Sequence, residues 1–213
     1  MALAASSALV LAACTGGSAP GGSSAGSRVT SGAGSQVLVV AGAGWDPSSL
    51  HGPVPAPGSC RLRVAADGRP LPDPVCTPGV VNSDVTQSDL ATTICRVGGY
   101  SDSVRPPESL TEAFKARSLA AYGESKPEGG YELDHLVPLG LGGASDTRNL
   151  WAEPDDHPGG AANSKDPVET ELHDLVCDAV DGGRPYLPLA AAQQLMASDW
   201  TTALAQGRAE LVG

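Results

Sequence analysis

The stretch "YELDHLVPLGLGGASDTRNLWAEP", residues 131–154, holds the residue types that phosphodiester hydrolysis requires. Asp134 carries carboxylate oxygens, the hard ligands that a divalent cation such as Mg²⁺ prefers. The adjacent His135 belongs to the residue type that exchanges a proton near neutral pH, as a general base must. Asn149 follows a Gly-rich segment and could reach back to fix the loop or the histidine ring. An Asp-His pair alone is common on protein surfaces, so the surrounding elements decide its meaning.

These elements are predicted to form a β-hairpin followed by a helix. "YELDHLV" begins a strand, "GLGGASD" is a turn by composition, and "NLWAE" is the returning strand. Adjacent side chains on a strand face opposite sides. Asp134 and His135 could therefore serve one site only if the strand ended or twisted between them. Asp166, Pro167 and Glu169 suit the N-cap, N1 and N3 positions of the following helix.

Further helices are expected around this unit. "SLTEAFKARSLAAYG" contains a capping-box pattern, Ser109 with Glu112, and a stop signal at Gly123. "PLAAAQQLMASDW" is expected to form the last helix. The predicted fold class is α+β, with a small hairpin-and-helix core surrounded by additional helices and disulfide-braced loops.

The first residues resemble an export signal. The apolar run that ends in "LAAC" is too short to span a membrane in the mature protein. The four letters are similar to the lipobox of bacterial lipoproteins, which implies that Cys14 is lipidated. No Lys or Arg precedes Arg28, so the usual positive segment is missing. We expect a signal peptide at 1–13, a lipid anchor and a flexible Gly/Ser/Pro-rich linker at 14–56, and the globular domain at 57–213.

The cysteine count supports export. The chain has 5 cysteines, and setting Cys14 aside leaves an even number, which indicates two disulfides with three pairings. We favour Cys60 with Cys76, which closes a short Pro-rich loop, and Cys95 with Cys177, which joins the N-terminal part to a later helix. A zinc site with all four thiolates is the alternative, but the sequence contains no C-x-x-C pair.

The charge balance limits the classes of partner. The net charge of -11 argues against broad nonspecific affinity for DNA, because phosphate contacts need Lys and Arg. It does not exclude a nuclease in which a bound metal supplies the local positive charge. Lys165 and Arg148 are interpreted as solvated charges rather than phosphate contacts. Trp151 and Trp200 are expected in the core.

The motifs resemble those of a known family. D-H-x-x-P-L-x-x-G-G, then N-L-W, then N-x-K before a helix, is similar to the HNH endonucleases of the ββα-metal superfamily. The closer resemblance is to small exported bacterial HNH-like proteins, and it spans about residues 74–200. The matching segments are "CTPG" at 76–79, "TIC" at 93–95, "VRPP" at 104–107, the core at 131–139 and "LHDLVC" at 172–177.

This resemblance implies a role for each matching residue. Asp134 corresponds to a metal ligand, His135 to the general base, and Asn149 to the residue that positions the base. Asn163, before the helix, is the candidate second metal ligand, and His173 is its rival. The metal is expected to be Mg²⁺, with Mn²⁺ or Zn²⁺ as alternatives. The zinc knuckles of many HNH proteins are absent, so disulfides are expected to brace the fold instead.

The functional hypothesis is an exported, lipid-anchored, metal-dependent endonuclease, a hydrolase of phosphodiester bonds with DNA favoured over RNA. Its expected location is the bacterial cell envelope, held to the membrane through Cys14, and no protein partner is evident. The alternative is a non-catalytic envelope lipoprotein that uses an HNH-like scaffold as a binding module. The acidic composition favours this alternative, whereas the Asp-His-Asn set favours the nuclease.

Overall fold

The structure is a computed structural model that describes residues 38–40, 49–124, 128–157, 163–182 and 184–212. The expected signal peptide, the lipidation site at Cys14 and most of the expected linker lie outside these residues. The described part combines helices with two-stranded sheets, which confirms the α+β class. None of its helices is long and apolar enough to cross a membrane.

The predicted hairpin is confirmed. Strands β5 (Tyr131–His135) and β6 (Leu150–Pro154) pair antiparallel in continuous register. Their connection is a folded loop rather than a tight turn, and it contains the short 3₁₀ helix η3 (Leu139–Leu141). Gly143 allows this loop to cross itself, because a Cβ at that position would lie 1.7 Å from the carbonyl oxygen of Val137. Glycine is therefore needed at this point, where two backbone segments of the loop lie too close together for a side chain.

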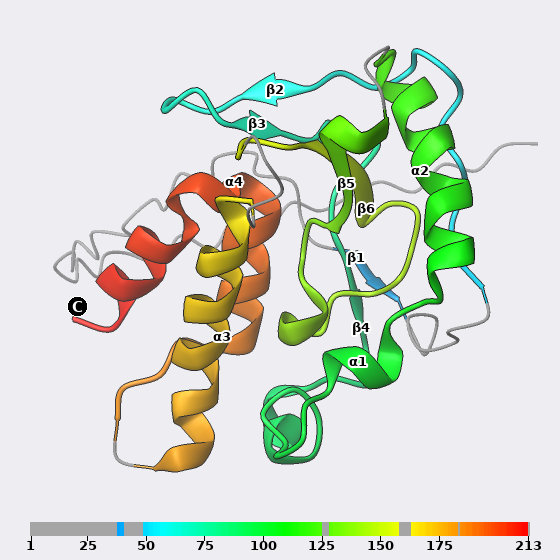
Figure 1. Cartoon of the computed structure of the whole chain (residues 1–213). Coiled ribbons are helices and arrows are strands. Elements are labelled where there is room, and N and C mark those ends of the chain that lie inside the picture. The colour runs from blue at the N-terminus through cyan, green and yellow to red at the C-terminus, as the bar shows by residue number, and fades with distance from the viewer. Residues whose placement is uncertain (1–37, 41–48, 125–127, 158–162, 183, 213) are drawn as a thin grey trace, which may run out of the picture. The chain divides into compact units, whose positions relative to one another are not determined.

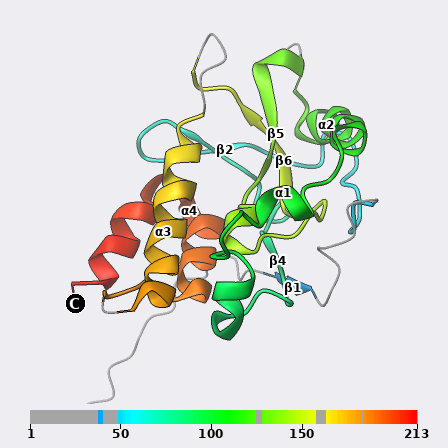
Figure 2. The ribbon, with the colours of Figure 1, turned by 60° about the horizontal axis from the view of Figure 1, so that its bottom comes forward.

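The hairpin lies between two helical layers (Figures 1 and 2). Helix α2 (Glu108–Tyr122) packs on one face, and Leu119 of α2 joins Tyr131 and Ala152 in a small apolar cluster. Helices α3 (Lys165–Asp181) and α4 (Leu189–Glu210) pack against each other on the other side. The apolar side chains of α3 recur at helical spacing and face the main core, in which Leu172 is fully buried.

The helix boundaries differ from those predicted. The N-cap of α2 is Pro107 and no side chain caps it, so Ser109 does not form the expected capping box. Gly123 ends α2 in the left-handed conformation, as predicted. Helix α3 begins two residues earlier than expected, after Ser164, which places Pro167 at N3. That position is still in the first turn, where the missing N–H costs no intrahelical hydrogen bond.

Helix α4 extends well beyond the predicted segment and is kinked at Asp199, whose backbone is extended. The Thr201 N–H donates to Asp199 Oδ1 at 3.0 Å, which supplies a side-chain acceptor at the kink. Local composition did not reveal this continuation because the helix is stabilised by packing: Trp200 and Ala203, on the far side of the kink, are fully buried.

The N-terminal half adds short elements around the loop of the hairpin. Strand β1 (Leu38–Val40) pairs parallel with β4 (Val80–Asn82), and β2 (Arg63–Val64) pairs antiparallel with β3 (Pro70–Leu71). The 3₁₀ helices η1 (Gln87–Thr92) and η2 (Glu128–Gly130) and the short helix α1 (Ser101–Val104) complete the chain. His51 forms a bridge with Asp146, so described residues before 57 join the unit that the sequence assigned to 57–213.

The described part contains two disulfides, and their pairing is the one that the sequence favoured. Cys60 is joined to Cys76 over a sequence separation of 16, and Cys95 to Cys177 over 82. The second bond ties α3 to the segment between η1 and α1. Because disulfides persist in oxidising compartments, the two bonds indicate an extracytoplasmic setting.

Candidate functional site

The candidate site lies where the end of β5 meets the first turn of α3. The β5–β6 register runs without interruption through Asp134, opposite Trp151, and His135, opposite Leu150. The strand neither ends nor twists between Asp134 and His135, so their side chains leave opposite faces of the hairpin. Asp134 faces α3, where its Oδ2 lies 2.8 Å from the Nζ of Lys165. The convergence of both side chains on one face, which the sequence hypothesis required, is not formed.

Lys165 is the centre of a polar cluster and is fully buried. Its Nζ donates to the backbone oxygen of His135 at 2.9 Å and forms ion pairs with Asp134 and, one helical turn later, Glu169. These three acceptors match the three hydrogens of an ammonium group. Burial alone would lower the pKa of Lys165, but the charges of Asp134 and Glu169 outweigh it and raise that pKa. The interpretation of Lys165 as a solvated charge is therefore wrong.

Burial raises the pKa of two carboxyl groups of this cluster, Glu153 and Glu169. Glu153 of β6 is 1% exposed, and its Oε1 has no hydrogen-bond partner among the described residues. Burial, reinforced by the charge of Asp134, raises the pKa of Glu153 to about 10. Burial also raises the pKa of Glu169 to about 7, against the opposing effect of Lys165. Glu153 is therefore protonated at neutral pH, and a cation bound beside it would favour its carboxylate form.

His135 is buried at the other face of the hairpin. Its Nε2 lies 3.2 Å from the Oγ of Ser145, which comes from the Gly-rich loop. Burial lowers the pKa of His135 to about 4. The ring is neutral at pH 7, but it does not titrate near neutrality as its residue type predicts. The cause is tertiary: the loop that covers the ring excludes the water that would stabilise imidazolium.

Asn149 is fully buried and braces the loop with all of its side-chain hydrogen-bonding groups. Its Oδ1 accepts from the N–H groups of Val80 and Val137, at 3.3 and 3.0 Å. Its Nδ2 donates to the carbonyl oxygens of Val137 and Ala144, at 2.9 and 3.0 Å. Asn149 thus joins β4 to both arms of the loop that follows His135. This geometry fits the positioning role that the resemblance implies.

The two candidates for the second metal ligand lie in different places. Asn163 is at the hairpin, where its Nδ2 donates to Oε2 of Glu132 at 3.3 Å. Glu132 and Asp134 share one face of β5 because they are two residues apart. His173 lies eight residues beyond Lys165 on α3, about 12 Å along the helix axis. His173 therefore does not share a site with Asp134, and of the two candidates only Asn163 is placed near it.

His173 belongs to a second group, formed with Cys95 and Cys177. One ligand atom from each of the three residues lies within 4.8 Å of the others, so this group could hold a metal ion. The Nε2 of His173 is 3.4 Å from the Sγ of Cys177 and 3.0 Å from the carbonyl oxygen of Ile94. In the structure the two cysteines form a disulfide, and sulfur binds metals as the thiolate.

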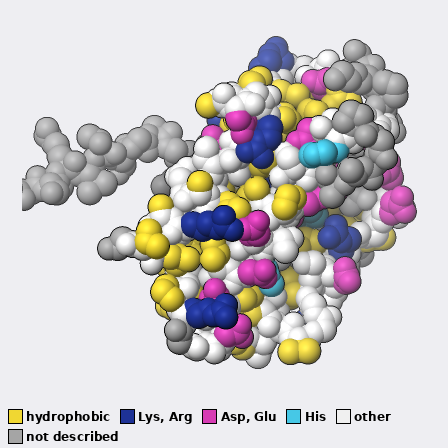
Figure 3. All heavy atoms as spheres, turned by 60° about the vertical axis from the view of Figure 1, so that its left-hand side comes forward, with side chains coloured by type: hydrophobic (Ala, Val, Ile, Leu, Met, Phe, Trp, Pro, Cys, Tyr) yellow, Lys and Arg dark blue, Asp and Glu magenta, His cyan; other side chains and the backbone are white. Residues whose placement is uncertain are grey.

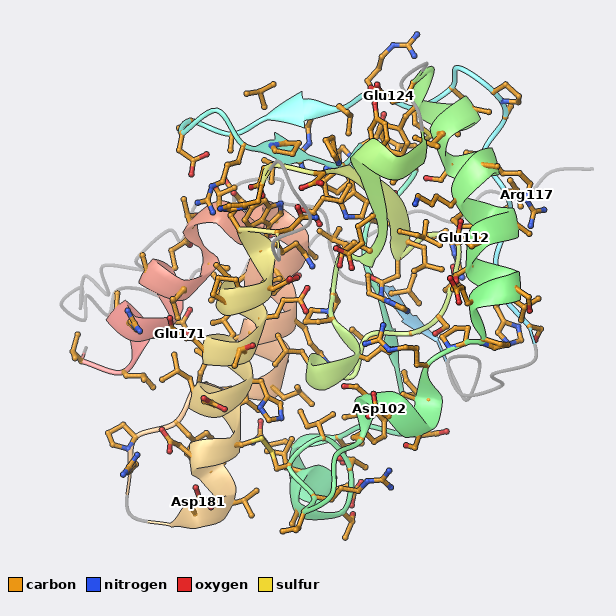
Figure 4. All side chains as sticks on the ribbon, in the orientation of Figure 1. Asp102, Glu112, Arg117, Glu124, Glu171 and Asp181 are labelled. Atoms are coloured by element: carbon orange, nitrogen blue, oxygen red, sulfur yellow. A yellow bond between two sulfur atoms is a disulfide. The ribbon has the colours of Figure 1, made fainter. Side chains whose placement is uncertain are left out.

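A cavity of about 490 Å³ lies along this part of α3. Its wall includes Glu169, His173 and the Cys95–Cys177 disulfide. Asp102 of α1 and Asp181 at the end of α3 also line it (Figure 4). These carboxyl groups outnumber the one arginine of the lining, so the cavity favours cations over phosphate groups. Neither Asp134 nor His135 is part of its wall.

Arg105 is a residue of interest that sequence reasoning noted only as part of "VRPP". It follows α1, its side chain is exposed, and its charge acts on both His135 and Glu132. No hydrogen bond or ion pair to Arg105 is found among the described residues. The Arg148 side chain, by contrast, donates two hydrogen bonds, of 2.9 and 2.8 Å, to the carboxylate of Asp146. The interpretation of Arg148 as a solvated charge is wrong.

The prediction that both tryptophans lie in the core is confirmed, whereas His157 is at the surface. His157 is exposed and pairs with Asp156 at 2.7 Å. Trp151 and Trp200 are fully buried. The indole nitrogen of Trp151 donates to Oδ2 of Asp134 at 3.1 Å, so this core residue also orients the carboxylate.

Comparisons of the chain with protein-family profiles, with curated proteins and with solved structures gave no match. The geometry of the cluster around Asp134 therefore carries the functional proposal.

Proposed function

We propose that the chain is an exported, metal-dependent endonuclease that hydrolyses phosphodiester bonds of DNA or RNA. The main observation in support of the proposal is that Asp134 lies beside the buried Glu153, whose Oε1 has no hydrogen-bond partner among the described residues. A hairpin followed by a helix holds these carboxyl groups on one face of the hairpin, and the neutral His135 follows Asp134 on the other face. The combination supplies metal ligands and a proton acceptor within one small unit, as metal-assisted hydrolysis requires.

The carboxyl groups fit a hard divalent cation. Asp134 and Glu153 lie on one face of the hairpin, diagonal to each other across the two strands. Mg²⁺ binds protein sites through one or two carboxylates and keeps several waters. Asp134 and Glu153 would hold the ion, with Asn163 as the nearest further oxygen donor suggested by sequence. A bound ion would stabilise the charge that develops on the phosphate.

His135 is proposed as the general base. A base must be unprotonated before it acts, and the lowered pKa of His135 meets this condition at neutral pH. Ser145 holds Nε2, and Asn149 fixes the loop that carries Ser145. Because the ring is only 7% exposed, substrate binding must open the loop enough for a water molecule to reach it. Catalytic contacts often form only in the substrate complex.

Arg105 is proposed to contact a substrate phosphate. The exposed Arg105 guanidinium lies near His135 and has no ion-pair partner among the described residues. It can therefore form bidentate hydrogen bonds with a phosphate group. This contact would place the scissile bond beside the end of β5. It would also offset part of the acidic charge around the site.

A second candidate function is a non-catalytic binding module, and one observation favours it. The ammonium group of Lys165 already neutralises Asp134 and engages the His135 backbone. A metal at Asp134 would lie close to this ammonium, and the repulsion would weaken metal binding. In this alternative the cluster serves only to fix α3 on the hairpin.

Cleavage assays of the purified protein distinguish the two functions. Supercoiled plasmid and single-stranded RNA are incubated with Mg²⁺ or Mn²⁺, and with EDTA. We expect metal-dependent cleavage that falls about 10²–10⁴-fold in His135→Ala, the usual contribution of a general base. His157→Ala is the matched control, because this exposed histidine pairs only with Asp156 among the described residues. Absence of metal-dependent cleavage by folded wild-type protein on either substrate would establish the binding-module alternative.

The membrane anchor is a separate part of the proposal. Cys14 would carry lipid and hold the domain at the outer face of a membrane through the linker. Acyl chains contribute about 0.8 kcal/mol per buried CH₂, so two or more chains give stable anchoring. Cys14→Ala should move the protein from the membrane to the soluble fraction or leave it unprocessed. Mass spectrometry of membrane-bound protein that showed an unmodified Cys14 would contradict the anchor.

A further inference from the structure

The disulfide end of α3 has the composition of a metal site that is distinct from the Asp134 cluster. His173 and Cys177 are one turn apart on the same helix face, and Cys95 reaches them from the segment before α1. Spacing of four residues on a helix is a common way to present two ligands to one metal. Two thiolates and one imidazole form a ligand set that suits zinc.

We propose that Cys95, His173 and Cys177 form a zinc site that the disulfide closes and reduction opens. A dithiol reductant would transfer two electrons and two protons to the Cys95–Cys177 bond and become a cyclic disulfide itself. Zn²⁺ would then displace the two thiol protons and bind both Sγ atoms and the Nε2 of His173. Thiol–disulfide exchange with a disulfide oxidant, which accepts the two electrons and is reduced to its thiols, would return the bond and release the ion. The inference does not depend on the nuclease proposal.

The distances require only a small local rearrangement. In a tetrahedral site with Zn–S of about 2.3 Å and Zn–N of about 2.0 Å, the sulfur and nitrogen ligands lie about 3.5 Å apart. The Nε2 of His173 is already 3.4 Å from the Sγ of Cys177. The two sulfurs would move from bonding distance, about 2 Å, to about 3.8 Å. Side-chain rotation of Cys95 can supply such a shift without moving α3.

The surroundings of His173 provide the supporting contact that a zinc-bound imidazole needs. Its Nδ1 lies 3.4 Å from Oδ1 of Asp174, and a ligand histidine commonly donates its other N–H to a carboxylate. In the oxidised protein Nε2 lies 3.0 Å from the carbonyl oxygen of Ile94. Zinc binding therefore selects the tautomer that carries its proton on Nδ1, and the contact to Ile94 is lost.

The acidic cavity gives the ion a route and an open coordination position. All three ligand residues lie on its wall, and Asp102 and Asp181 from α1 and α3 add negative charge (Figure 4). A water molecule in the cavity would complete the tetrahedron. The second disulfide lacks these features: Cys60 is fully buried, and no histidine forms a group with Cys60 and Cys76 among the described residues.

The contrast between the two disulfides supplies the matched control. Both sulfur-bearing residues of the Cys95–Cys177 bond are partly exposed, whereas in the other bond Cys76 is partly exposed and Cys60 is fully buried. Because thiol exchange requires access, we expect the Cys95–Cys177 bond to open first at low dithiol concentration. Reduced protein is titrated anaerobically with Co²⁺, whose thiolate-to-cobalt absorption reports sulfur ligands, and then with Zn²⁺. The proteins compared are wild type, His173→Gln, and the double variant Cys60→Ser with Cys76→Ser.

We expect one thiolate-bound ion per reduced wild-type molecule, the same thiolate–cobalt stoichiometry in the Cys60/Cys76 double variant, and no thiolate–cobalt absorption before reduction. His173→Gln removes a direct ligand, so its affinity should fall at least about 10–100-fold, the effect of losing even a supporting contact. Zn²⁺ should raise the melting temperature of the reduced wild type. If reduction alone unfolds the protein, Zn²⁺ should restore the folded state. Absent thiolate–cobalt absorption, unchanged affinity in His173→Gln, or reduced protein that stays unfolded with Zn²⁺ would each overturn the proposal.

Discussion

Glu153 shows how burial and charge compete at one side chain. The residue lies inside the cluster, its pKa is raised to about 10, and one carboxyl oxygen has no hydrogen-bond partner among the described residues. An ordinary glutamate in the unfolded chain ionises above about 4.5. Folding at neutral pH must therefore supply a proton to Glu153, which destabilises the folded state. Such a cost is expected where a site is built for a ligand rather than for stability.

Glu153→Gln should raise the free energy of unfolding at pH 7 to 8 while weakening metal binding. The amide needs no proton, so the loss of stability that wild type suffers as pH rises above about 4.5 should disappear. We expect a gain of at least about 1 kcal/mol, the equivalent of one pKa unit. Urea unfolding of both proteins at pH 4 and pH 8 measures it. A variant that is less stable than wild type at pH 8 would show that Glu153 is ionised and partnered.

His135 should make the fold acid-sensitive. The unfolded chain binds a proton at this side chain below about 6.5, whereas the folded protein does so only below about 4. Protons therefore favour the unfolded state, and the stability present above pH 6.5 should be lost as pH falls toward 4. The difference corresponds to on the order of 3 kcal/mol. In His135→Gln this part of the pH dependence should vanish, and parallel stability curves for both proteins would refute a buried neutral histidine.

At the residue scale, the sequence identifies polar residues of the candidate site but not how deeply they are buried. Asp134, His135 and Asn149 are recognisable because their types and spacing fit one reaction. Lys165 was interpreted as a solvated charge and Glu153 was not singled out, because a buried charge looks the same in sequence as a solvated one. The i,i+4 spacing of Lys165 and Glu169 and the alternation that puts Glu153 on the face of Asp134 were the available signals.

One buried cation joins α3 to the hairpin. Lys165 joins the first turn of α3 to Asp134 and to the backbone of β5, and it is completely buried. Removing one partner of a buried ion pair leaves the other charge without compensation, which is costly. The order of elements and the apolar stripe of α3 were predictable from periodicity. The angle of α3 against the hairpin was not, because it depends on this contact between distant residues.

Lys165→Met should destabilise the protein by about 3–5 kcal/mol, the usual cost of breaking a buried pair. Lys115→Met on α2 is the control, since Lys115 is only partly buried and its change should stay within about 0.5 kcal/mol. Thermal unfolding at neutral pH compares the two. Adding Asp134→Asn to Lys165→Met should restore part of the loss, because the unpaired carboxylate is removed. If Lys165→Met matched the control, the cluster would not hold α3 in place.

The charge of the whole molecule constrains how it meets a nucleic acid. The net charge is -11, and on the face shown in Figure 3 basic side chains alternate with acidic ones rather than forming a continuous basic area. Several arginines form ion pairs with carboxylates, including Arg69, Arg148 and Arg208. Phosphate contacts are therefore expected at few points, with Arg105 the foremost.

Binding of a labelled oligonucleotide should depend only weakly on salt. Each neutralised phosphate contributes a slope of about -0.9 (about -0.7 for single strands) to the log–log dependence of affinity on salt, so one or two contacts give a slope no steeper than about -2. Fluorescence anisotropy from low to physiological salt measures the slope. Arg105→Gln should lower affinity and make the slope shallower by about 1. A slope steeper than about -4 would contradict contact with phosphate at few points.

The order of the disulfides along the chain has a consequence for biogenesis. The first cysteine of the domain pairs with the second, and the third with the fourth. During N-to-C emergence into an oxidising compartment, Cys60 and Cys76 can pair before Cys95 arrives. Cys95 is then the only free thiol of the domain until Cys177 follows, so stepwise oxidation yields the native pairs without shuffling. We expect the protein to mature with a disulfide-forming oxidant alone, without help from a disulfide isomerase.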